Sequence, residues 1–225
     1  MPSKNKQKSK KSVRFSRLLL VLGIAFTIYG AYGFLQWWRT THKSHSITNI
    51  ATDLTTTLTN STDNPDETKV DPTTYTVAAD MPRRILISSI LSDGFIQKVG
   101  VDQHSAIAVP SNVHYAGWYT NSVTPGQPGL SIIDGHVSGK YSEGVFKRLG
   151  NLKMSDEFEV EFGDLSKKKF EVVGVAIVDE ADAAKELFST DPAIKQQLKL
   201  ITCGGKFDAK TQRFAKRIIV SAKLI

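Results

Sequence analysis

The hydrophobic and polar residues of this chain fall into three successive zones. Residues 18–38 form an apolar run without a charged side chain, and residues 39–80 are mostly polar. From residue 81 onward, short apolar stretches alternate with turns rich in glycine, proline, asparagine and aspartate. Short strands at such regular spacing, with little helical periodicity, predict an all-β domain at residues 81–225, either a barrel or a sandwich.

The strand pattern is clearest in the middle of this third zone. Residues 157–162 alternate strictly, so Phe158, Val160 and Phe162 are expected to face the core and the intervening glutamates the solvent. Residues 170–178 are apolar throughout, which predicts a central strand covered on both faces. The pattern predicts further strands at 84–90, 95–99, 106–109, 130–134, 198–202 and 214–224, a long loop at 112–129 and a short helix at 183–188.

The apolar run near the N-terminus is long enough to cross a membrane. About 20 apolar residues at 1.5 Å rise span a hydrocarbon core of ~30 Å, and Leu18–Trp38 has that length. A cleavable signal peptide is the alternative. Its apolar core is shorter, about 7–15 residues, and Gln36–Arg39 is a poor cleavage site. We therefore predict an uncleaved transmembrane anchor at residues 18–38.

The formal net charge of +7 is concentrated in one place. Every charged residue of positions 1–17 is basic, and without this tail the chain has equal numbers of basic and acidic side chains. By the positive-inside rule the tail stays in the cytoplasm, which places residues 39–225 outside the cell membrane. A nucleic-acid-binding domain carries its basic patch on the fold itself, so we expect no nucleic-acid partner. Residues 39–80 contain too few large apolar side chains to form a core and are predicted to be an extracellular stalk.

No pattern in the sequence indicates a metal or another cofactor. His42 and His45 lie in the predicted stalk without acidic or cysteine partners at ligand spacing. The later part of the chain has no acidic cluster that suggests a calcium site. We therefore expect no cofactor and no bound metal.

Cys203, the only cysteine, is the strongest candidate for a reactive group. It ends the apolar run Leu198–Thr202 and precedes Gly204 and Gly205, which predicts a thiol where a buried strand opens into a loop. Outside the membrane structural cysteines occur in pairs, and an unpaired one suggests a reactive thiol. A core cysteine without a chemical role is the alternative, because unpaired cysteines are often fully buried.

A cysteine enzyme also needs an imidazole to handle the thiol proton and hydrogen-bond donors for the oxyanion. Among the histidines after residue 81, only His136 follows a strand end and a glycine, as Cys203 does. A guanidinium near the thiol would stabilise the oxyanion and lower the thiol pKa. If the last strand folds back beside the strand that ends at Cys203, Arg213 and Arg217 approach the thiol and share one strand face.

Five motifs follow one another in this zone: Ile90-x-x-Asp93-x-x-Ile96, Gly117-Trp118-Tyr119 with Pro125-Gly126, Gly135-His136-Val137, Val145-Phe146-x-x-Leu149 and Leu200-Ile201-Thr202-Cys203. In order and spacing they resemble the sortases, cysteine transpeptidases of bacterial cell surfaces, and Gly-His-Val with Thr-Cys-Gly-Gly is most similar to class F and its neighbours. The resemblance implies an eight-stranded β-barrel with short helices. It also implies that His136 is the general acid and base, Cys203 the nucleophile and Arg217 the oxyanion stabiliser, with Arg213 as the second candidate for that role.

The resemblance further implies a substrate and a partner. Sortases attack the Thr–Gly bond of an LPxTG-like sorting signal near the C-terminus of a substrate protein and form a thioester. They then transfer the protein to an amine of a peptidoglycan precursor or a pilin. Trp118 and Tyr119 are interpreted as packing residues. Ser138 departs from the family pattern, because related enzymes often carry an acid after Gly-His-Val.

Two alternative functions stay open at this point. The first is a catalytically inactive, anchored β-barrel that binds a partner and cleaves nothing. The second is another thiol acyl-transferase that acts on peptidoglycan, such as an L,D-transpeptidase, although those enzymes carry Ser-x-Gly-Cys where this chain has Leu-Ile-Thr-Cys. A papain-like enzyme is disfavoured because its cysteine precedes its histidine in the chain.

Overall fold

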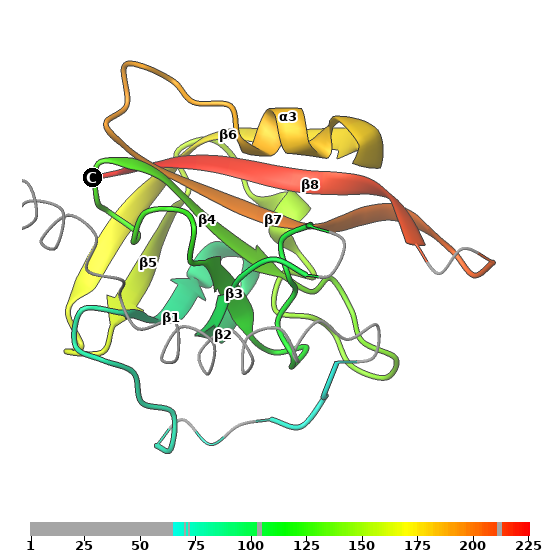
Figure 1. Cartoon of the computed structure of the whole chain (residues 1–225), viewed down its shortest axis with the longest axis horizontal. Coiled ribbons are helices and arrows are strands. Elements are labelled where there is room, and N and C mark those ends of the chain that lie inside the picture. The colour runs from blue at the N-terminus through cyan, green and yellow to red at the C-terminus, as the bar shows by residue number, and fades with distance from the viewer. Residues whose placement is uncertain (1–64, 70, 72, 103–104, 211–212) are drawn as a thin grey trace, which may run out of the picture. The chain divides into compact units, whose positions relative to one another are not determined.

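The eight strands of the computed structural model close into one barrel in the order β1-β2-β3-β4-β7-β8-β6-β5, and β5 pairs again with β1 (Figure 1). The predicted all-β barrel with short helices is therefore confirmed. The structure describes residues 65–69, 71, 73–102, 105–210 and 213–225. The strands are β1 (Pro82–Ile87), β2 (Ser92–Val99), β3 (Ala116–Tyr119), β4 (Gly129–Gly135), β5 (Glu157–Phe162), β6 (Lys167–Asp179), β7 (Gln196–Asp208) and β8 (Arg213–Leu224).

The helical segments are short and lie between strands. They are the helix α3 (Ala183–Leu187) and the 3-10 turns η1 (Ser88–Ile90), η2 (Leu149–Asn151) and η3 (Glu180–Asp182). In the described part of the chain no helix has the length and hydrophobicity that a bilayer crossing requires. The anchor predicted at 18–38 lies outside the described residues.

The alternation of side chains along the strands fills the barrel interior. Phe158, Val160 and Phe162 of β5 are buried there, as their period of two predicted. Phe158 stacks on Phe170 of β6 with ring centroids 5.5 Å apart. Burial of each such side chain contributes about 1.5–3 kcal/mol to folding, so this interior is the main source of the barrel's stability.

A second, smaller apolar cluster lies on the outer face of the sheet. It joins Ile132 of β4 and Ile219 of β8 to Leu187 of α3, whereas their strand neighbours Ile133 and Val220 belong to the interior cluster. Because successive side chains of a strand point to opposite faces, the smaller cluster is outside the barrel. Figure 1 shows α3 along β8 on this side. The helix therefore covers the outer face of β4 and β8.

Two local predictions in the first half of the domain are wrong. The segment predicted as a loop at 112–129 contains β3, which pairs parallel with β2 and antiparallel with β4. Its Trp118 is buried, and the indole N–H donates to the Val123 carbonyl at 3.2 Å. The strand predicted at 106–109 is only an isolated bridge between Ile107 and Val101. The assignment of β3 depends on its pairing with β2 and β4, which local propensity does not register.

Two predictions about exposure are also wrong. β6 is covered only in part: Val175 packs on the interior cluster and Val178 on the outer one, but Ile177 is 60% exposed. A strand of a closed barrel has an interior and an exterior face, so an apolar run does not prove burial on both. Glu161 does not face water; it is buried and its carboxylate lies 2.5 Å from the guanidinium of Arg83.

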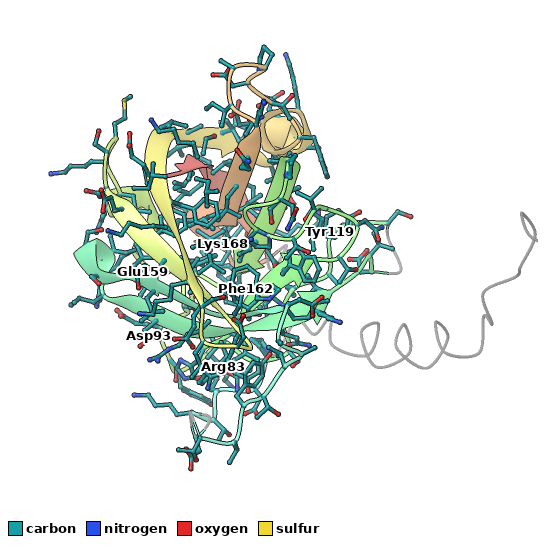
Figure 2. All side chains as sticks on the ribbon, turned by 90° about the vertical axis from the view of Figure 1, so that its left-hand side faces the viewer. Arg83, Asp93, Tyr119, Glu159, Phe162 and Lys168 are labelled. Carbon is teal, nitrogen blue, oxygen red and sulfur yellow. The ribbon has the colours of Figure 1, made fainter. Side chains whose placement is uncertain are left out.

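The Pro125-Gly126 turn packs tightly against β6. Gly126 has a φ of +81°, which favours glycine. A Cβ at this position would lie 2.5 Å from Cδ of Lys168. The ammonium of Lys168 donates to the Pro125 carbonyl at 3.1 Å and lies 4.7 Å from the centre of the Phe162 ring (Figure 2). The positive φ therefore favours glycine in this motif, whereas the end of the flexible Lys168 side chain could move to make room for a Cβ.

Part of the segment predicted as a stalk lies against the barrel. Residues 65–69, here called the strap, include Asp66, which forms an isolated parallel bridge with Asn112. The carboxylate of Glu67 accepts the N–H of Tyr141 at 3.0 Å. The prediction of a stalk without contacts to the domain therefore fails for the strap. Hydrogen bonds hold it in place, and an argument from hydrophobicity alone does not detect them.

Candidate active site

Cys203 on β7 and Arg217 on β8 are direct partners in the antiparallel pairing of the two strands. Gly204 and Gly205, predicted to begin a loop, instead lie within β7, which continues to Asp208. The register shifts just after Gly204, and Gly205 adopts a φ of +76° that glycine tolerates without strain. The thiol therefore lies at an irregularity inside a long β7–β8 pair, which Figure 1 shows running on past the other strands.

His136 follows the last residue of β4, the strand beside β7. β4 and β7 run parallel, and the Thr202 hydroxyl donates to the Gly135 carbonyl at 2.7 Å. One residue further along each strand come His136 and Cys203. The structure therefore brings the histidine and the cysteine to the same level on neighbouring strands.

The imidazole of His136 is partly buried, and its orientation is fixed by Pro110. Its Nε2 lies 2.7 Å from the Pro110 carbonyl oxygen. A carbonyl only accepts, so Nε2 carries a proton, and Nδ1 is the acceptor in the neutral ring. Burial lowers the pKa of His136, and the hydrogen bond to Pro110 opposes this shift in part. The ring is therefore neutral at neutral pH.

The backbone of His136 is held by the segment that follows it. Its carbonyl accepts the N–H of Phe146 at 3.0 Å. Gly144 approaches this carbonyl so closely that an added Cβ would lie 2.1 Å from the oxygen. A Cβ at Gly135 would lie 2.6 Å from the Phe146 ring. Close packing therefore explains why glycine occupies both positions around the histidine.

Arg217 is the arginine that the structure places opposite the thiol. Its Nη2 lies 2.7 Å from Oε1 of Glu180 in η3, and its side chain is 20% exposed. Arg213, by contrast, is 72% exposed, lies 3.7 Å from the same Glu180 carboxylate and has Asp208 as its register partner, at the far end of β8. The two arginines share a strand face as predicted, but only Arg217 is level with Cys203.

The groups around Cys203 shift the pKa of its thiol in opposite directions. Burial raises the pKa of the thiol, and the positive charge of Arg217 works against that shift. The negative charge of Glu180 raises the thiol pKa further, and so does Asp134 where it is ionised. The thiol is therefore protonated at neutral pH and needs a base before it can attack.

A cavity of about 490 Å³ opens beside Cys203, and Arg217 also lines it. Its walls are largely apolar and come from the outer face of the sheet, from α3 and from residues 105–109. His136 is absent from the lining, although Gly135 contributes to it. Tyr119, interpreted from the sequence as a packing residue, borders the cavity.

Sequence reasoning missed two acidic residues of this cavity, Asp134 and Glu180. Asp134 ends an apolar run directly before Gly135 and His136. An acid in that position was a detectable signal, since carboxylates rarely end buried strands. Glu180 lies in a segment without a motif and could not be singled out. Among the described residues no group of three or more histidines, cysteines or acids could hold a metal ion.

Comparison with known proteins gives a single family. A sequence profile of the sortase domain matches residues 90–225. No curated protein sequence matches the chain.

Solved structures of similar fold are sortases of classes A, C and D. A lid mutant of sortase A from Corynebacterium diphtheriae is 23% identical over 68% of this chain and 74% of its own, with a TM-score of 0.50. Sortase C-1 from Actinomyces oris is 19% identical over 80% and 99% of the two chains, with a TM-score of 0.49. A Clostridium perfringens sortase D5 transpeptidase is 22% identical over 65% and 79%, with a TM-score of 0.45. At these identities the likeness concerns the fold alone, and the resemblance to class F stays a prediction.

Proposed function

This chain belongs to the sortase family of cysteine transpeptidases, and on that premise we propose that it is a membrane-anchored enzyme that cleaves an LPxTG-like sorting signal. The substrate protein is then transferred to an amine of a peptidoglycan precursor or a pilin. The observation that carries this proposal is the pairing of Cys203 with Arg217 beside the cavity. His136 lies level with the thiol on the next strand, which supports its role as the base.

In the first half of the reaction, neutral His136 takes the thiol proton as the sulfur of Cys203 attacks the carbonyl carbon of the Thr–Gly bond. A C–S bond forms and the carbonyl oxygen becomes an oxyanion, which the guanidinium of Arg217 stabilises. When the intermediate collapses, the C–N bond breaks. The imidazolium of His136 gives its proton to the leaving amine, and a thioester stays on Cys203.

In the second half, the amine of the acceptor attacks the thioester. His136 accepts the amine proton and returns a proton to the sulfur, so the free thiol and a new amide bond result. Arg217 stabilises the second oxyanion in the same way. Water in place of the amine gives hydrolysis, so the acceptor determines whether the enzyme acts as a transferase.

The sequence supports a place for this reaction at the outer face of the membrane. The basic tail 1–17 and the apolar run 18–38 together form the pattern of an N-terminal anchor with the tail in the cytoplasm. Residues 39–64 then act as a tether, and the barrel with its strap lies outside. Enzyme, sorting signal and acceptor amine would thereby meet at one membrane surface.

Intact mass spectrometry of the full chain in detergent tests the chemistry. An LPxTG-type peptide is added with and without an amine such as triglycine. We expect an acyl adduct on Cys203 that the amine discharges into a ligated peptide. Cys203→Ala should form no adduct. An adduct that only water discharges would indicate a peptidase, and no adduct with any sorting peptide would favour the binding module.

A cysteine-labelling experiment tests the topology. Met154 is 71% exposed, so a Cys203→Ser chain with Met154→Cys presents one accessible thiol. In intact cells a membrane-impermeant maleimide should label this thiol if the barrel is extracellular. Labelling only after the cells are lysed would contradict the proposed orientation.

A further inference from the structure

Asp134 of β4 carries a buried carboxyl oxygen that has no hydrogen-bond partner among the described residues. The residue is 7% exposed and borders the cavity beside Cys203. Within the described part of the chain, Oγ of Ser131 is the other buried side-chain atom without a partner. An unpaired buried polar atom costs about 1–3 kcal/mol. The unpaired oxygen of Asp134 therefore lowers the stability of the fold, and no described residue forms a hydrogen bond with it.

The fold leaves space for this carboxyl group. Asp134 is the register partner of Gly117 in the β3–β4 pairing. A Cβ added at Gly117 would lie 2.2 Å from Oδ1 of Asp134. The glycine of the Gly-Trp-Tyr motif therefore makes room for Oδ1 of Asp134 where β3 and β4 pair.

The nearby groups of the cavity do not satisfy Asp134. Ile107 and Ile201 contribute apolar wall, and the other acid, Glu180, is already paired with Arg217 at 2.7 Å. Burial raises the pKa of Asp134 well above its usual range, so its carboxyl group keeps its proton to a higher pH than an exposed aspartate does. A neutral carboxyl both donates and accepts a hydrogen bond. Its best complement is a hydroxyl or a carboxamide.

We propose that Asp134 is a specificity-determining residue that hydrogen-bonds a hydroxyl or carboxamide side chain of the sorting signal, at a position before its threonine. This inference rests on the proposed function above. Asp134 is the register partner of Ile201, two residues before Cys203. An extended substrate peptide advances about 3.3 Å per residue, as a strand does. The substrate side chain that reaches Asp134 therefore lies roughly two positions from the carbonyl that Cys203 attacks.

Acylation rates of the full chain test the inference. LPxTG-type peptides keep Thr-Gly constant and carry near-isosteric pairs, Asn against Leu and Thr against Val, at each of the three preceding positions. We expect wild type to prefer the polar member about 5- to 100-fold at one position, because an apolar side chain leaves the carboxyl unpaired.

Three variants localise the effect. Asp134→Asn keeps a neutral group that donates and accepts, so it should keep the preference. Asp134→Leu should lose or reverse it while still reacting with the apolar peptide. Ser131→Ala removes the other unpaired atom and should leave the preference unchanged. Thermal unfolding shows whether each variant is folded, and the wild-type comparison decides the matter even if Asp134→Leu is not.

The outcomes separate this inference from the proposed function. If wild type reacts with no peptide, both are overturned. If it reacts with both members of every pair at equal rates, only the role of Asp134 is overturned. A preference for a lysine-containing peptide would also overturn it, since an ammonium group requires an ionised carboxylate.

Discussion

Arg217 is paired across the strands with Cys203 and is at the same time bound to Glu180, 2.7 Å away. One guanidinium thus faces both a thiol and a carboxylate. The ion pair orients the planar group, because it occupies one edge of the guanidinium and limits rotation of the side chain. Glu180 is therefore a positioning residue for Arg217, the group proposed to stabilise the oxyanion.

Arg217→Ala is expected to slow acylation about 10²- to 10³-fold, the usual effect of removing an oxyanion donor. Arg217→Lys should recover only part of the rate, because an ammonium is a point charge without the planar fork of donors. Single-turnover mass spectrometry measures the rate, and thermal unfolding shows that the fold is retained.

Arg213→Ala is the matched control for this prediction. Arg213 lies on the same strand face and 3.7 Å from Glu180, but it is 72% exposed and its register partner is Asp208 in place of Cys203. The variant should acylate at close to the wild-type rate. If Arg213→Ala acylates far more slowly than wild type while Arg217→Ala keeps the wild-type rate, the roles assigned to the two arginines are reversed.

Removal of the positive charge of Arg217 and removal of the negative charge of Glu180 should shift the pKa of the Cys203 thiol in opposite directions. Burial raises the pKa of Cys203, Arg217 lowers it and Glu180 raises it. Arg217→Ala should therefore raise the pKa further, and Glu180→Gln should lower it. The pH dependence of alkylation measures both, and because Cys203 is the only cysteine the mass shift reports on it alone. A shift of the same sign in both variants would contradict this account.

Much of the site could be predicted from local patterns. The run that ends at Cys203 and the run around Ile219 both read as strands, and their closeness in sequence predicted that they pair as neighbours. The period of two then placed Arg213 and Arg217 on one face. Both steps use only the pairing of strands that follow each other in the sequence and the alternation of side chains along a strand. The choice of an eight-stranded barrel over a sandwich was available only through the resemblance to a family.

The remainder depends on contacts between distant segments. No local pattern pairs Gly117 with Asp134, and the space that the glycine leaves appears only when β3 and β4 are side by side. Glu180 was invisible for the same reason, because its partner Arg217 is 37 positions away. Polar contacts of this kind have no periodicity, so composition and spacing cannot reveal them.

Glu67 offers a test of the strap through pH. Burial alone would raise the pKa of Glu67, but hydrogen bonds from Tyr141, Ser142 and Lys140 outweigh it and lower the pKa. A carboxyl whose pKa is lower in the folded state stabilises the fold above its unfolded pKa, and this contribution is lost as the pH falls through the folded pKa. Glu67→Gln should therefore unfold at a lower temperature than wild type at about pH 7, and the difference should shrink towards about pH 3.

The control for the strap is Glu157→Gln. Glu157 forms an exposed ion pair with Lys169 at 3.1 Å, and such pairs contribute little to stability. Its unfolding temperature should stay close to that of wild type. A Glu67→Gln variant as stable as wild type at neutral pH would show that the strap is not held by this carboxylate.

Lys199 gives the last prediction, because it joins α3 to the sheet. Its side chain is 4% exposed, and its ammonium donates to the backbone carbonyl of Glu186 and to Oγ of Ser189, the latter at 2.7 Å. Lysines near a helix C-terminus stabilise its unpaired carbonyls. Lys199→Met keeps the apolar stem but removes the hydrogen bonds to the end of α3. The free energy of unfolding should fall by about 1–3 kcal/mol as a result. Since α3 lines the cavity, KM for the sorting peptide should rise more than kcat falls. Lys185→Met, an exposed change on the same helix, should alter neither, and a fall in kcat at constant KM would contradict a role for α3 in binding.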